Sequence, residues 1–472
     1  YDKVYGCWIG KSIGGTLGAP FEGKRALLDV CDFHSQAGRP LPNDDLDLQL
    51  IWLKALEDRG PKGINEQVLG EYWLNYIPPH WNEYGLAKSN MKAGILPPLS
   101  GDHENVWRHS NGAWIRTEIW ACCAPGCPRI ATRFAWSDAC VDHGTGEGTY
   151  AALFMASVES AAFILSDREQ LIQIGLSYIP TDCRVARSVR IALRSYQEGL
   201  DFKEARKLVI QDSSDLGWFQ APANVAFVII GWLYGEGDFK KSLLAAINCG
   251  DDTDCTGATL GSILGIIQGA SAIPEDWKKH VGDEIVTVAV DRGSLHTLPA
   301  TCAELTERTM RMCDQVLAAF DAKVVLTDAE VNWPQPGSDW LMSTESDRQW
   351  LSERDDSLSF DFIHTLAKVQ FPDGLYIKPG ETRRVRITLK NQMPDPRHVE
   401  LHVYLPDGWL LTDGPFHVNL PHQTAESKPE CSFELTIQAG PTICASNRGV
   451  ISMNAIGRPT PMLVPLLFLG QS

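Results

Sequence analysis

The sequence has no long apolar run and no leader-like start. Nothing in its 472 residues approaches the roughly 18 consecutive apolar residues that a membrane-spanning helix needs. The N-terminus also lacks the basic residues followed by an apolar segment that direct export. We therefore expect a cytoplasmic chain that neither crosses a membrane nor carries an export signal.

Positive charge is also scarce. The chain has 42 Lys and Arg residues against 59 Asp and Glu residues, a formal net charge of −17, and no local run of basic residues offsets this balance. Such a charge repels phosphate backbones and anionic lipid surfaces, whereas it attracts cations. We expect neither nucleic acid nor a membrane among the partners.

The cysteines lack the spacing of a zinc site. There are 13 of them, an odd number, and the group Cys122, Cys123 and Cys127 has no matching second half elsewhere in the chain. Without such a framework, most of these residues are expected to be reduced and buried. The sequence therefore predicts thiols that fill a core.

The chain contains ample apolar material for a core. Hydrophobic residues make up 44% of it, and its length favours two or three domains. Up to about Phe320, apolar residues recur every three or four positions, which predicts an all-α domain of about a dozen helices. Residues 97–112 are expected to form an irregular surface loop. The clearest helical segments are 46–57, 148–165, 185–198 and 224–234.

The pattern changes towards the C-terminus. The polar segment 326–356, which contains Asn332-Trp333-Pro334, is typical of a linker with one short helix. Beyond it, about seven runs alternate in polarity or are β-branched, and Pro-Gly or Asp-Gly turns separate them, which predicts an immunoglobulin-like β-sandwich. The clearest runs are 376–389, 399–405, 431–437, 449–456 and 462–469. We expect an all-α domain at 1–322, a linker at 323–360 and a sandwich at 361–472.

Glycines form two ladders with a spacing of four residues. They are Gly6, Gly10, Gly14 and Gly18 near the N-terminus, and Gly257, Gly261, Gly265 and Gly269. Each ladder lies on one face of a helix. Because glycine costs a helix roughly 1 kcal/mol relative to alanine, the ladders predict very close backbone approach between two central helices.

Three aspartates precede the second ladder, in Asp251-Asp252-Thr253-Asp254. A helix cap needs only one side-chain oxygen and contributes about 1 kcal/mol, whereas three adjacent carboxylates repel one another unless a cation neutralises them. Asp252 and Asp254 can both turn oxygens towards one hard cation, such as Mg²⁺ or Mn²⁺. This motif favours metal binding over capping.

Asn43-Asp44-Asp45-Leu46-Asp47 precedes a predicted helix in the same way. Alone, this motif is equally consistent with an Asn43 cap followed by acidic residues that favour the helix dipole. Two acidic helix entrances in one helical domain nevertheless suggest a single shared site, in which carboxylates can bridge two metal ions.

The motifs resemble those of the ADP-ribosylglycohydrolase family, in order and in rough spacing, over about residues 1–320. The family's Gly-rich helix ends in Gly-x-Pro-x-Glu, as residues 18–22 do here. Its Thr-Asp-Asp motif resembles residues 43–45, its Asn-Gly-x-x-x-Arg stretch resembles 111–116, and its Gly-Asp-Thr-Asp-Thr signature resembles 251–255. The resemblance implies an orthogonal all-α bundle whose site holds two Mg²⁺ or Mn²⁺ ions. The ligands that it implies are Asp44, Asp45, Asp252 and Asp254.

Two positions depart from the family pattern. Asn43 and Cys255 stand where the family has threonine ligands. An amide oxygen can replace a hydroxyl, but a thiol is a poor Mg²⁺ ligand, so either Thr256 substitutes or one metal position is weakened. Asp47 and Asp251 are additional carboxylates that can compensate.

Hydrolysis at an anomeric carbon needs a positioned water, assistance to the leaving group and a fixed sugar ring. Divalent ions can supply the first and the third. Glu22 matches the position where many family members keep a glutamate at the scissile bond, which implies a general acid/base or water-orienting role. The alternative is that Glu22 is a surface residue after a turn.

The resemblance also implies a set of substrate-binding residues. They are Asn111, Gly112, Arg116, His143 and Gly146. His143 lies in a segment that resembles the family's Thr-His turn, so it either binds a sugar or a phosphate or is structural. Arg116 pairs either with a phosphate or with a carboxylate. One or two tryptophans are expected to stack on a ligand and the others to be core; the candidates are Trp107, Trp114, Trp120 and Trp136.

Three functions remain open from the sequence. The first is removal of ADP-ribose from a protein side chain or a small molecule. The second is hydrolysis of a furanoside or another sugar with adjacent hydroxyls, which the C-terminal segment favours because it resembles accessory sandwiches of carbohydrate enzymes. The third is a non-catalytic metal-binding protein like the lens crystallins related to this family, and the presence of Glu22 argues against it.

Overall fold

The computed structural model describes residues 1–472 except 294, 296, 328–337, 355–356, 426 and 472. The chain divides into two compact units. We call them the helical unit, Tyr1–Lys88 with Ser100–Gln349, and the β unit, Ser89–Leu99 with Trp350–Ser472. Much of the expected linker, including Asn332-Trp333-Pro334, lies outside the described residues. The domain boundaries expected from the sequence therefore stay a prediction.

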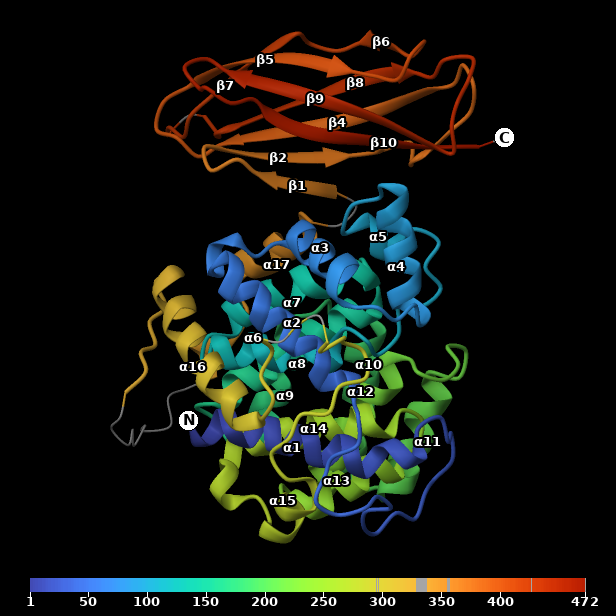
Figure 1. Ribbon diagram of the computed structural model, residues 1–472, viewed down its shortest axis with the longest axis vertical. Helices are drawn as coiled ribbons and strands as arrows, with labels where there is room; N and C mark the ends of the chain where they lie inside the picture. The colour runs from blue at the N-terminus through green and yellow to red at the C-terminus, as the bar shows by residue number, and fades with distance from the viewer. Residues whose placement is uncertain (294, 296, 328–337, 355–356, 426, 472) are drawn as a thin grey trace. The chain divides into compact units, whose positions relative to one another are not determined.

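The helical unit is all-α, as predicted (Figure 1). Every segment with clear three- and four-residue spacing is helical, in α2, α8, α10 and α12. The described residues contain more α-helices than the dozen expected, because helices as short as α5 have no visible period. The α-helices are α1 Asp2–Gly18, α2 Asp44–Arg59, α3 Glu66–Tyr76, α4 Asn82–Ala93, α5 Leu99–Asp102, α6 Glu118–Cys123, α7 Pro128–His143, α8 Glu147–Ala162, α9 Arg168–Ser177, α10 Arg184–Gln197, α11 Phe202–Asp212, α12 Ala221–Tyr234, α13 Phe239–Asn248, α14 Thr253–Gln268, α15 Glu275–Val281, α16 Cys302–Ala319 and α17 Glu345–Ser352.

The two glycine ladders form the interface between α1 and α14. Gly6 meets Gly265, Gly10 meets Gly261 and Gly14 meets Gly257, so the two helices run antiparallel. A Cβ atom added at any of these positions would collide with backbone atoms of the facing helix. The predicted close approach is therefore confirmed. It brings the C-terminal end of α1 against the N-terminal end of α14, where the Thr253 hydroxyl donates to the Gly18 carbonyl at 2.8 Å.

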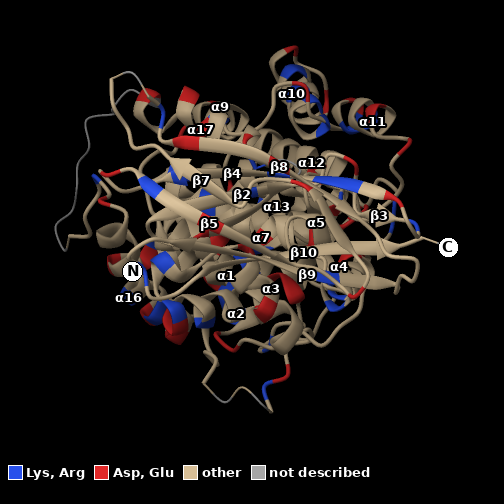
Figure 2. Cartoon of the chain, turned by 90° about the horizontal axis from the view of Figure 1, so that it is seen from above, with Lys and Arg blue, Asp and Glu red and all other residues tan. Residues whose placement is uncertain are grey.

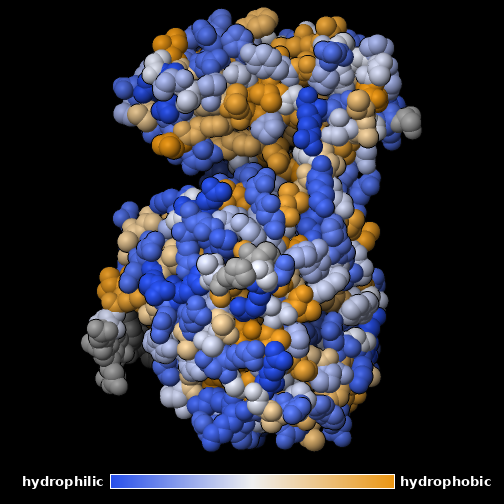
Figure 3. Space-filling view, viewed as in Figure 1, coloured by the Kyte–Doolittle hydropathy of each residue, from blue (hydrophilic) through white to orange (hydrophobic). Residues whose placement is uncertain are grey.

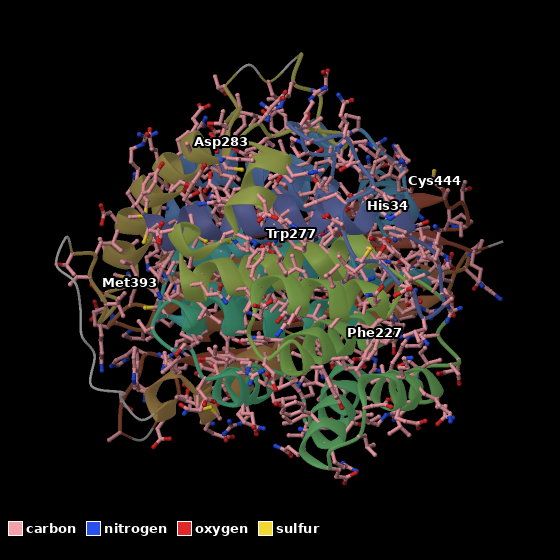
Figure 4. All side chains as sticks on the ribbon, turned by 90° about the horizontal axis from the view of Figure 1, so that it is seen from below. His34, Phe227, Trp277, Asp283, Met393 and Cys444 are labelled. Carbon is pink, nitrogen blue, oxygen red and sulfur yellow. The ribbon has the colours of Figure 1, made fainter. Side chains whose placement is uncertain are left out.

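Large apolar side chains fill the rest of the helical unit. Trp114, Trp120 and Trp136 are completely or almost completely buried, as expected for most of the tryptophans, whereas Trp107 is half-buried. All 13 cysteines are free and most are buried, which confirms the prediction of reduced core thiols. Trp277 of α15, labelled in Figure 4, is buried between Phe33 and Phe239.

The β unit is a sandwich of two five-stranded sheets, with strand orders β1-β2-β4-β8-β6 and β3-β10-β9-β5-β7. All pairs are antiparallel except β3 with β10. Alternate residues of β4, such as Val385, Ile387 and Leu389, enter one apolar core shared by both sheets. The strands are β1 Ser357–Asp361, β2 Thr365–Gln370, β3 Tyr376–Ile377, β4 Thr382–Asn391, β5 Arg397–Tyr404, β6 Leu410–Asp413, β7 His417–Leu420, β8 Glu430–Gln438, β9 Ser446–Ala455 and β10 Met462–Gly470.

The predicted sandwich is confirmed, but some of its parts were not foreseen. Four of the five predicted runs are single strands, and the fifth, 376–389, contains two strands, β3 and β4, which lie in different sheets. Strands β1, β2, β6 and β7 were missed because they are short or lie in polar sequence. Residues 89–99 also belong to the β unit. There the Ser446 hydroxyl donates to the Ala93 carbonyl at 2.9 Å, and Leu96 and Leu99 pack on the sandwich core.

The described residues include no helix long and apolar enough to cross a membrane. Acidic and basic residues are interspersed along α10, α11 and α16 (Figure 2). On the face shown in Figure 3, apolar residues are visible on the β unit, whose exposed apolar side chains include Tyr404, Leu410 and Phe416.

Candidate metal centre

The first acidic motif forms the N-terminal turn of α2. Asn43 is its cap, since its side-chain oxygen accepts a hydrogen bond from the Asp45 backbone N–H at 2.7 Å. Asp44 is half-buried and accepts a hydrogen bond from the Tyr84 hydroxyl at 3.0 Å. Asp45 is completely buried, and neither of its carboxylate oxygens has a hydrogen-bond partner. The motif therefore caps its helix and still leaves a carboxylate unsatisfied.

The second acidic motif forms the start of α14, with Asp252 at the cap position. One oxygen of Asp252 accepts a hydrogen bond from the Asn111 side-chain amide at 2.6 Å. Its other oxygen and one oxygen of Asp254 are buried without a partner. Neither side chain bonds to the helix end in the manner of a cap, so capping does not explain them.

The packing of α1 against α14 and α2 brings Glu22 and the two acidic motifs together in two clusters. Ligand atoms of Asp45, Asp254 and Cys255 all lie within 4.8 Å of one another, and so do those of Glu22, Asp252 and Asp254. Asp254 belongs to both clusters. Side chains of the two acidic helix entrances therefore lie close together.

Burial and mutual repulsion raise the pKa of each carboxyl group in these clusters. Burial raises the pKa of Asp252 to about 7. Burial also raises the pKa of Asp45 well above its usual range, with Lys11 acting against it and Asp254 adding to it. For Asp254, burial and then the charges of Asp252 and Glu22 raise the pKa. A buried carboxylate without a partner is costly, so these oxygens fit a bound cation.

Cys255, rather than the neighbouring Thr256, belongs to the first cluster. The Thr256 hydroxyl instead donates to the Thr253 carbonyl at 3.2 Å, inside its own helix. Among the described residues, neither cluster includes Asp47 or Asp251. One oxygen of Asp47 accepts hydrogen bonds from Val288 and Ala289, both at 2.6 Å, and Asp251 pairs with Arg25 at 3.2 Å.

Glu22 directly follows the short 3₁₀ turn Ala19–Phe21 at the end of α1. The backbone around it is fastened to the second motif: Gly23 donates to the Asp251 carbonyl at 2.8 Å, and Asp251 donates to the Lys24 carbonyl at 2.9 Å. The residue itself is exposed at the edge of its cluster. Partial burial of the carboxyl group and the charge of Asp44 raise its pKa. A proton is therefore held more readily here than on an ordinary glutamate.

The expected substrate-binding residues lie next to the clusters, mostly in buried contacts. Asn111 lies between Asp252 and Trp114, whose indole N–H donates to the Asn111 side-chain oxygen at 3.0 Å. A Cβ atom at Gly112 would collide with Glu83, and one at Gly146 would collide with the Arg108 carbonyl. Both glycines therefore allow close packing of neighbouring segments.

Arg116 and His143 form one buried network. Arg116 is fully buried and bonded to Asp138 at 2.9 Å and to Asp142 at 2.7 Å, so the carboxylate alternative is the one found. His143 is also fully buried, with one ring nitrogen 2.8 Å from Asp142 and the other 3.0 Å from the Ser110 hydroxyl. These contacts connect α7 to the loop that ends at Asn111.

Several residues at the site carry no sequence signal. Tyr84 bonds Asp44, and the Asn224 side chain accepts a hydrogen bond from the Asp252 backbone N–H at 3.3 Å. Lys11 is buried on α1 and lies 2.6 Å from Glu118, and its charge acts on Asp45. Nothing in the sequence around Lys11 shows that this lysine is buried and paired with Glu118, so it was not foreseen.

The family match to known proteins covers most of the helical unit. The profile of the family described as ADP-ribosylglycohydrolase matches residues 1–312. An uncharacterized protein of Archaeoglobus fulgidus is 21% identical over 300 residues, which cover 60% of this chain and 92% of that protein. A solved structure described as an ADP-ribosylglycohydrolase-related protein complex is 19% identical, covers 67% of this chain and 98% of its own, and has a TM-score of 0.44. A FixG-related protein from Vibrio parahaemolyticus is 8% identical, covers 23% of this chain and 98% of its own, and has a TM-score of 0.20.

Proposed function

This chain belongs to the ADP-ribosylglycohydrolase family, and on that premise we propose that it is a divalent-metal-dependent hydrolase of a glycosidic bond at a ribose-like anomeric carbon. The observation that carries the proposal is the set of buried carboxylate oxygens without partners on Asp45, Asp252 and Asp254. Folding places these charges together at a cost, which a bound cation offsets. In a domain with only a structural role, buried carboxylates without partners would lower stability and bring no compensating gain.

The residues at the two helix entrances would hold two Mg²⁺ or Mn²⁺ ions. The proposed ligands are Asn43, Asp44, Asp45, Asp252, Asp254 and Cys255. Thr256 is the alternative ligand to Cys255. Bound there, the ions supply positive charge and Lewis acidity, which lower the pKa of water and fix adjacent sugar hydroxyls. Oxygen donors dominate the set, as hard cations prefer.

Glu22 is the proposed general acid/base or water-orienting residue. It stands at the exposed edge of the cluster, where substrate can reach it, and partial burial and the charge of Asp44 raise its pKa, so it holds a proton more readily than an ordinary glutamate. Asn111 and Asn224 position Asp252 through hydrogen bonds, and the buried Arg116–Asp142–His143 network holds the loop that carries Asn111. We expect Glu22→Gln to abolish turnover and to leave metal binding intact; unchanged turnover would remove Glu22 from the mechanism.

Two substrate classes are open within this function. The family makes ADP-ribosyl conjugates, on a protein or a small molecule, the first class to test. A glycoside without a diphosphate is the second. It is favoured by the pairing of Arg25, the arginine that contacts the second acidic motif, with the Asp251 carboxylate.

The deciding experiment is calorimetric titration of ADP-ribose into the Mg²⁺-loaded protein. The control is the double variant Asp252→Ala, Asp254→Ala. Tight binding that the double variant loses would support an ADP-ribosyl substrate held at the metal centre. Absence of binding to a protein that still takes up metal would point to the glycoside, and failure of the wild-type protein to bind metal would overturn the proposal.

A further inference from the structure

A lysine is buried in the glycine-rich helix α1, close to the first acidic motif. Lys11 is only 1% exposed, and its ammonium group lies 2.6 Å from the carboxylate of Glu118, which is also fully buried. Burying two charges costs free energy that their attraction offsets only in part, and apolar side chains of similar size are often equally stable in such a place. Stability alone therefore does not explain the pair.

Hydrogen bonds connect this ion pair to the turn that carries Asp45. The side-chain amide of Gln49, on α2, donates to Glu118 at 2.7 Å and to the Asp45 carbonyl at 3.0 Å. The Ile119 backbone N–H donates to the side-chain oxygen of Gln49 at 2.7 Å, which fixes the amide between α2 and α6. The positions of Lys11, Glu118 and the first turn of α2 are thus tied to one another.

The ion pair presents its positive end to the first acidic motif. Burial raises the pKa of Asp45, and Lys11 is the neighbour that opposes this rise most strongly, whereas Glu118 adds to it less strongly. Burial also raises the pKa of Asp44, and Lys11 is again among the groups that lower it. Lys11 therefore acts as a fixed positive charge on these two carboxylates.

The two clusters of the candidate metal centre differ in their surroundings. We call them the thiol cluster, Asp45, Asp254 and Cys255, and the carboxylate cluster, Glu22, Asp252 and Asp254. In the thiol cluster one ligand is a poor partner for a hard cation, and the charge of Lys11 repels an ion bound to Asp45. The carboxylate cluster offers only oxygen ligands. After burial, the negative charges of Asp252 and Glu22 raise the pKa of Asp254, and the same charges favour a bound cation.

We propose that Lys11 is a built-in counter-ion of the thiol cluster, so that the carboxylate cluster holds a divalent cation tightly and the thiol cluster exchanges its cation readily. This inference rests on the proposed metal-dependent function and makes its two ion positions unequal. The ammonium group neutralises part of the charge of Asp45 before any ion binds, and it repels the cation that arrives there. Occupancy of the thiol cluster then follows the free cation concentration.

Titration of the full, metal-free chain with Mn²⁺ tests this inequality. Calorimetry measures the two affinities, and the electron paramagnetic resonance signal of free Mn²⁺ counts the ions bound. We expect the first ion to bind at least about tenfold more tightly than the second. Asp45→Asn should remove the second step and preserve the first, whereas Asp252→Asn should weaken the first.

Variants of the ion pair test the role of Lys11 itself. The double variant Lys11→Met, Glu118→Gln removes both charges and keeps a side-chain oxygen that accepts from Gln49. It should bind the second ion about tenfold more tightly and the first as in wild type. Glu118→Gln alone leaves the ammonium charge without its partner and should weaken the second step. Lys54→Met, which removes the charge of a partly exposed lysine on α2, is the control and should change neither step.

Opposite shifts in the double variant and in Glu118→Gln support the inference, because damaged packing would weaken both steps in both variants. A second step that appears only in the double variant also supports it. Two ions of equal affinity in wild type, or a second step that neither variant shifts, would overturn the role of Lys11 and leave the metal-dependent function in place. If the double variant does not fold, Glu118→Gln decides, and a second step as strong as in wild type overturns the inference. A chain that binds no Mn²⁺ overturns the proposed function as well.

Discussion

Among the described residues, Cys255 is the one thiol in the candidate metal centre. Its sulfur lies in a cluster with Asp45 and Asp254, where the family has a hydroxyl donor. Because sulfur is a poor partner for a hard cation, we expect Cys255→Ser to raise the affinity for Mg²⁺ by roughly tenfold. Calorimetric titration with Mg²⁺ measures this. Cys249→Ser, which changes a buried thiol outside both clusters, should have no such effect, and equal affinity of the two variants would show that the sulfur is not a ligand.

We expect Glu83 to make folding stability depend on pH. Burial, followed by the charge of Asp142, raises its pKa to about 8, and one of its oxygens has no partner. Between its usual pKa of about 4.5 and 8, the folded state keeps a proton that the unfolded state releases, so stability falls as pH rises, by at most about 1.4 kcal/mol per pH unit. Glu83→Gln should remove this slope.

Denaturant unfolding at several pH values, with metal removed, measures the slope as the difference between the variant and wild type. Glu71→Gln on the exposed side of α3 is the matched control and should keep the wild-type slope. If the free energy difference between wild type and Glu83→Gln does not change with pH, the carboxyl group of Glu83 does not exchange its proton in this window.

The sequence singles out Asp45, Asp252 and Asp254, which the structure brings into the clusters, but it does not reveal the residues that hold them in place. Three aspartates at one helix entrance stand out in the sequence because no basic residue among them neutralises their mutual repulsion. The bond between Asn111 and Asp252 joins positions 141 residues apart, and no spacing in the sequence encodes it. The same holds for Tyr84 on Asp44. The sequence therefore reveals clustered carboxylates, but it does not reveal the distant residues that donate hydrogen bonds to them.

At the scale of elements, the α1–α14 pair determines the geometry of the site. Gly261 faces Gly10, so the Cβ atom of Gly261→Ala would collide with the Gly10 carbonyl. Alanine has the higher helix propensity, by roughly 1 kcal/mol, but separating two packed backbones costs more. We expect this variant to lose at least about 2 kcal/mol of stability and to bind metal more weakly, because the two helix ends that carry Glu22 and Asp254 move apart.

Thermal unfolding and Mn²⁺ titration of Gly261→Ala measure both effects. Gly63→Ala is the control, since its added carbon meets only the side chain of Arg59. A Gly261→Ala variant as stable as wild type would mean that α1 and α14 do not require glycine to pack. Reduced stability with unchanged metal affinity would separate packing from site geometry.

The elements differed in how well they could be predicted. The packing of α1 on α14 could be predicted because each glycine lowers helix propensity, and close contact between two helices explains why glycine recurs every four residues. Strands β6 and β7 have only four residues each, too few to establish an alternation. Residues 89–99 look like part of the helical domain in sequence and join the sandwich through contacts such as Ser446 with Ala93, 353 positions away.

At the scale of the whole molecule, each unit has its own apolar core. Ligands of the candidate metal centre all belong to the helical unit, and the sandwich core is formed by the β unit alone. A bound ion stabilises only the folded state to which it binds, by about 2.7 kcal/mol at one hundred times its dissociation constant. The effect of metal on stability should therefore be confined to one unit.

Differential scanning calorimetry of the full chain, with Mn²⁺ and with EDTA, tests this division. We expect two unfolding transitions, of which Mn²⁺ raises only one. Ile387→Ala, which removes a fully buried side chain from β4, identifies the other: it should lower that transition by the equivalent of about 2–5 kcal/mol and leave the metal-sensitive one in place. A single transition that responds to both changes would show that the two units unfold as one cooperative body.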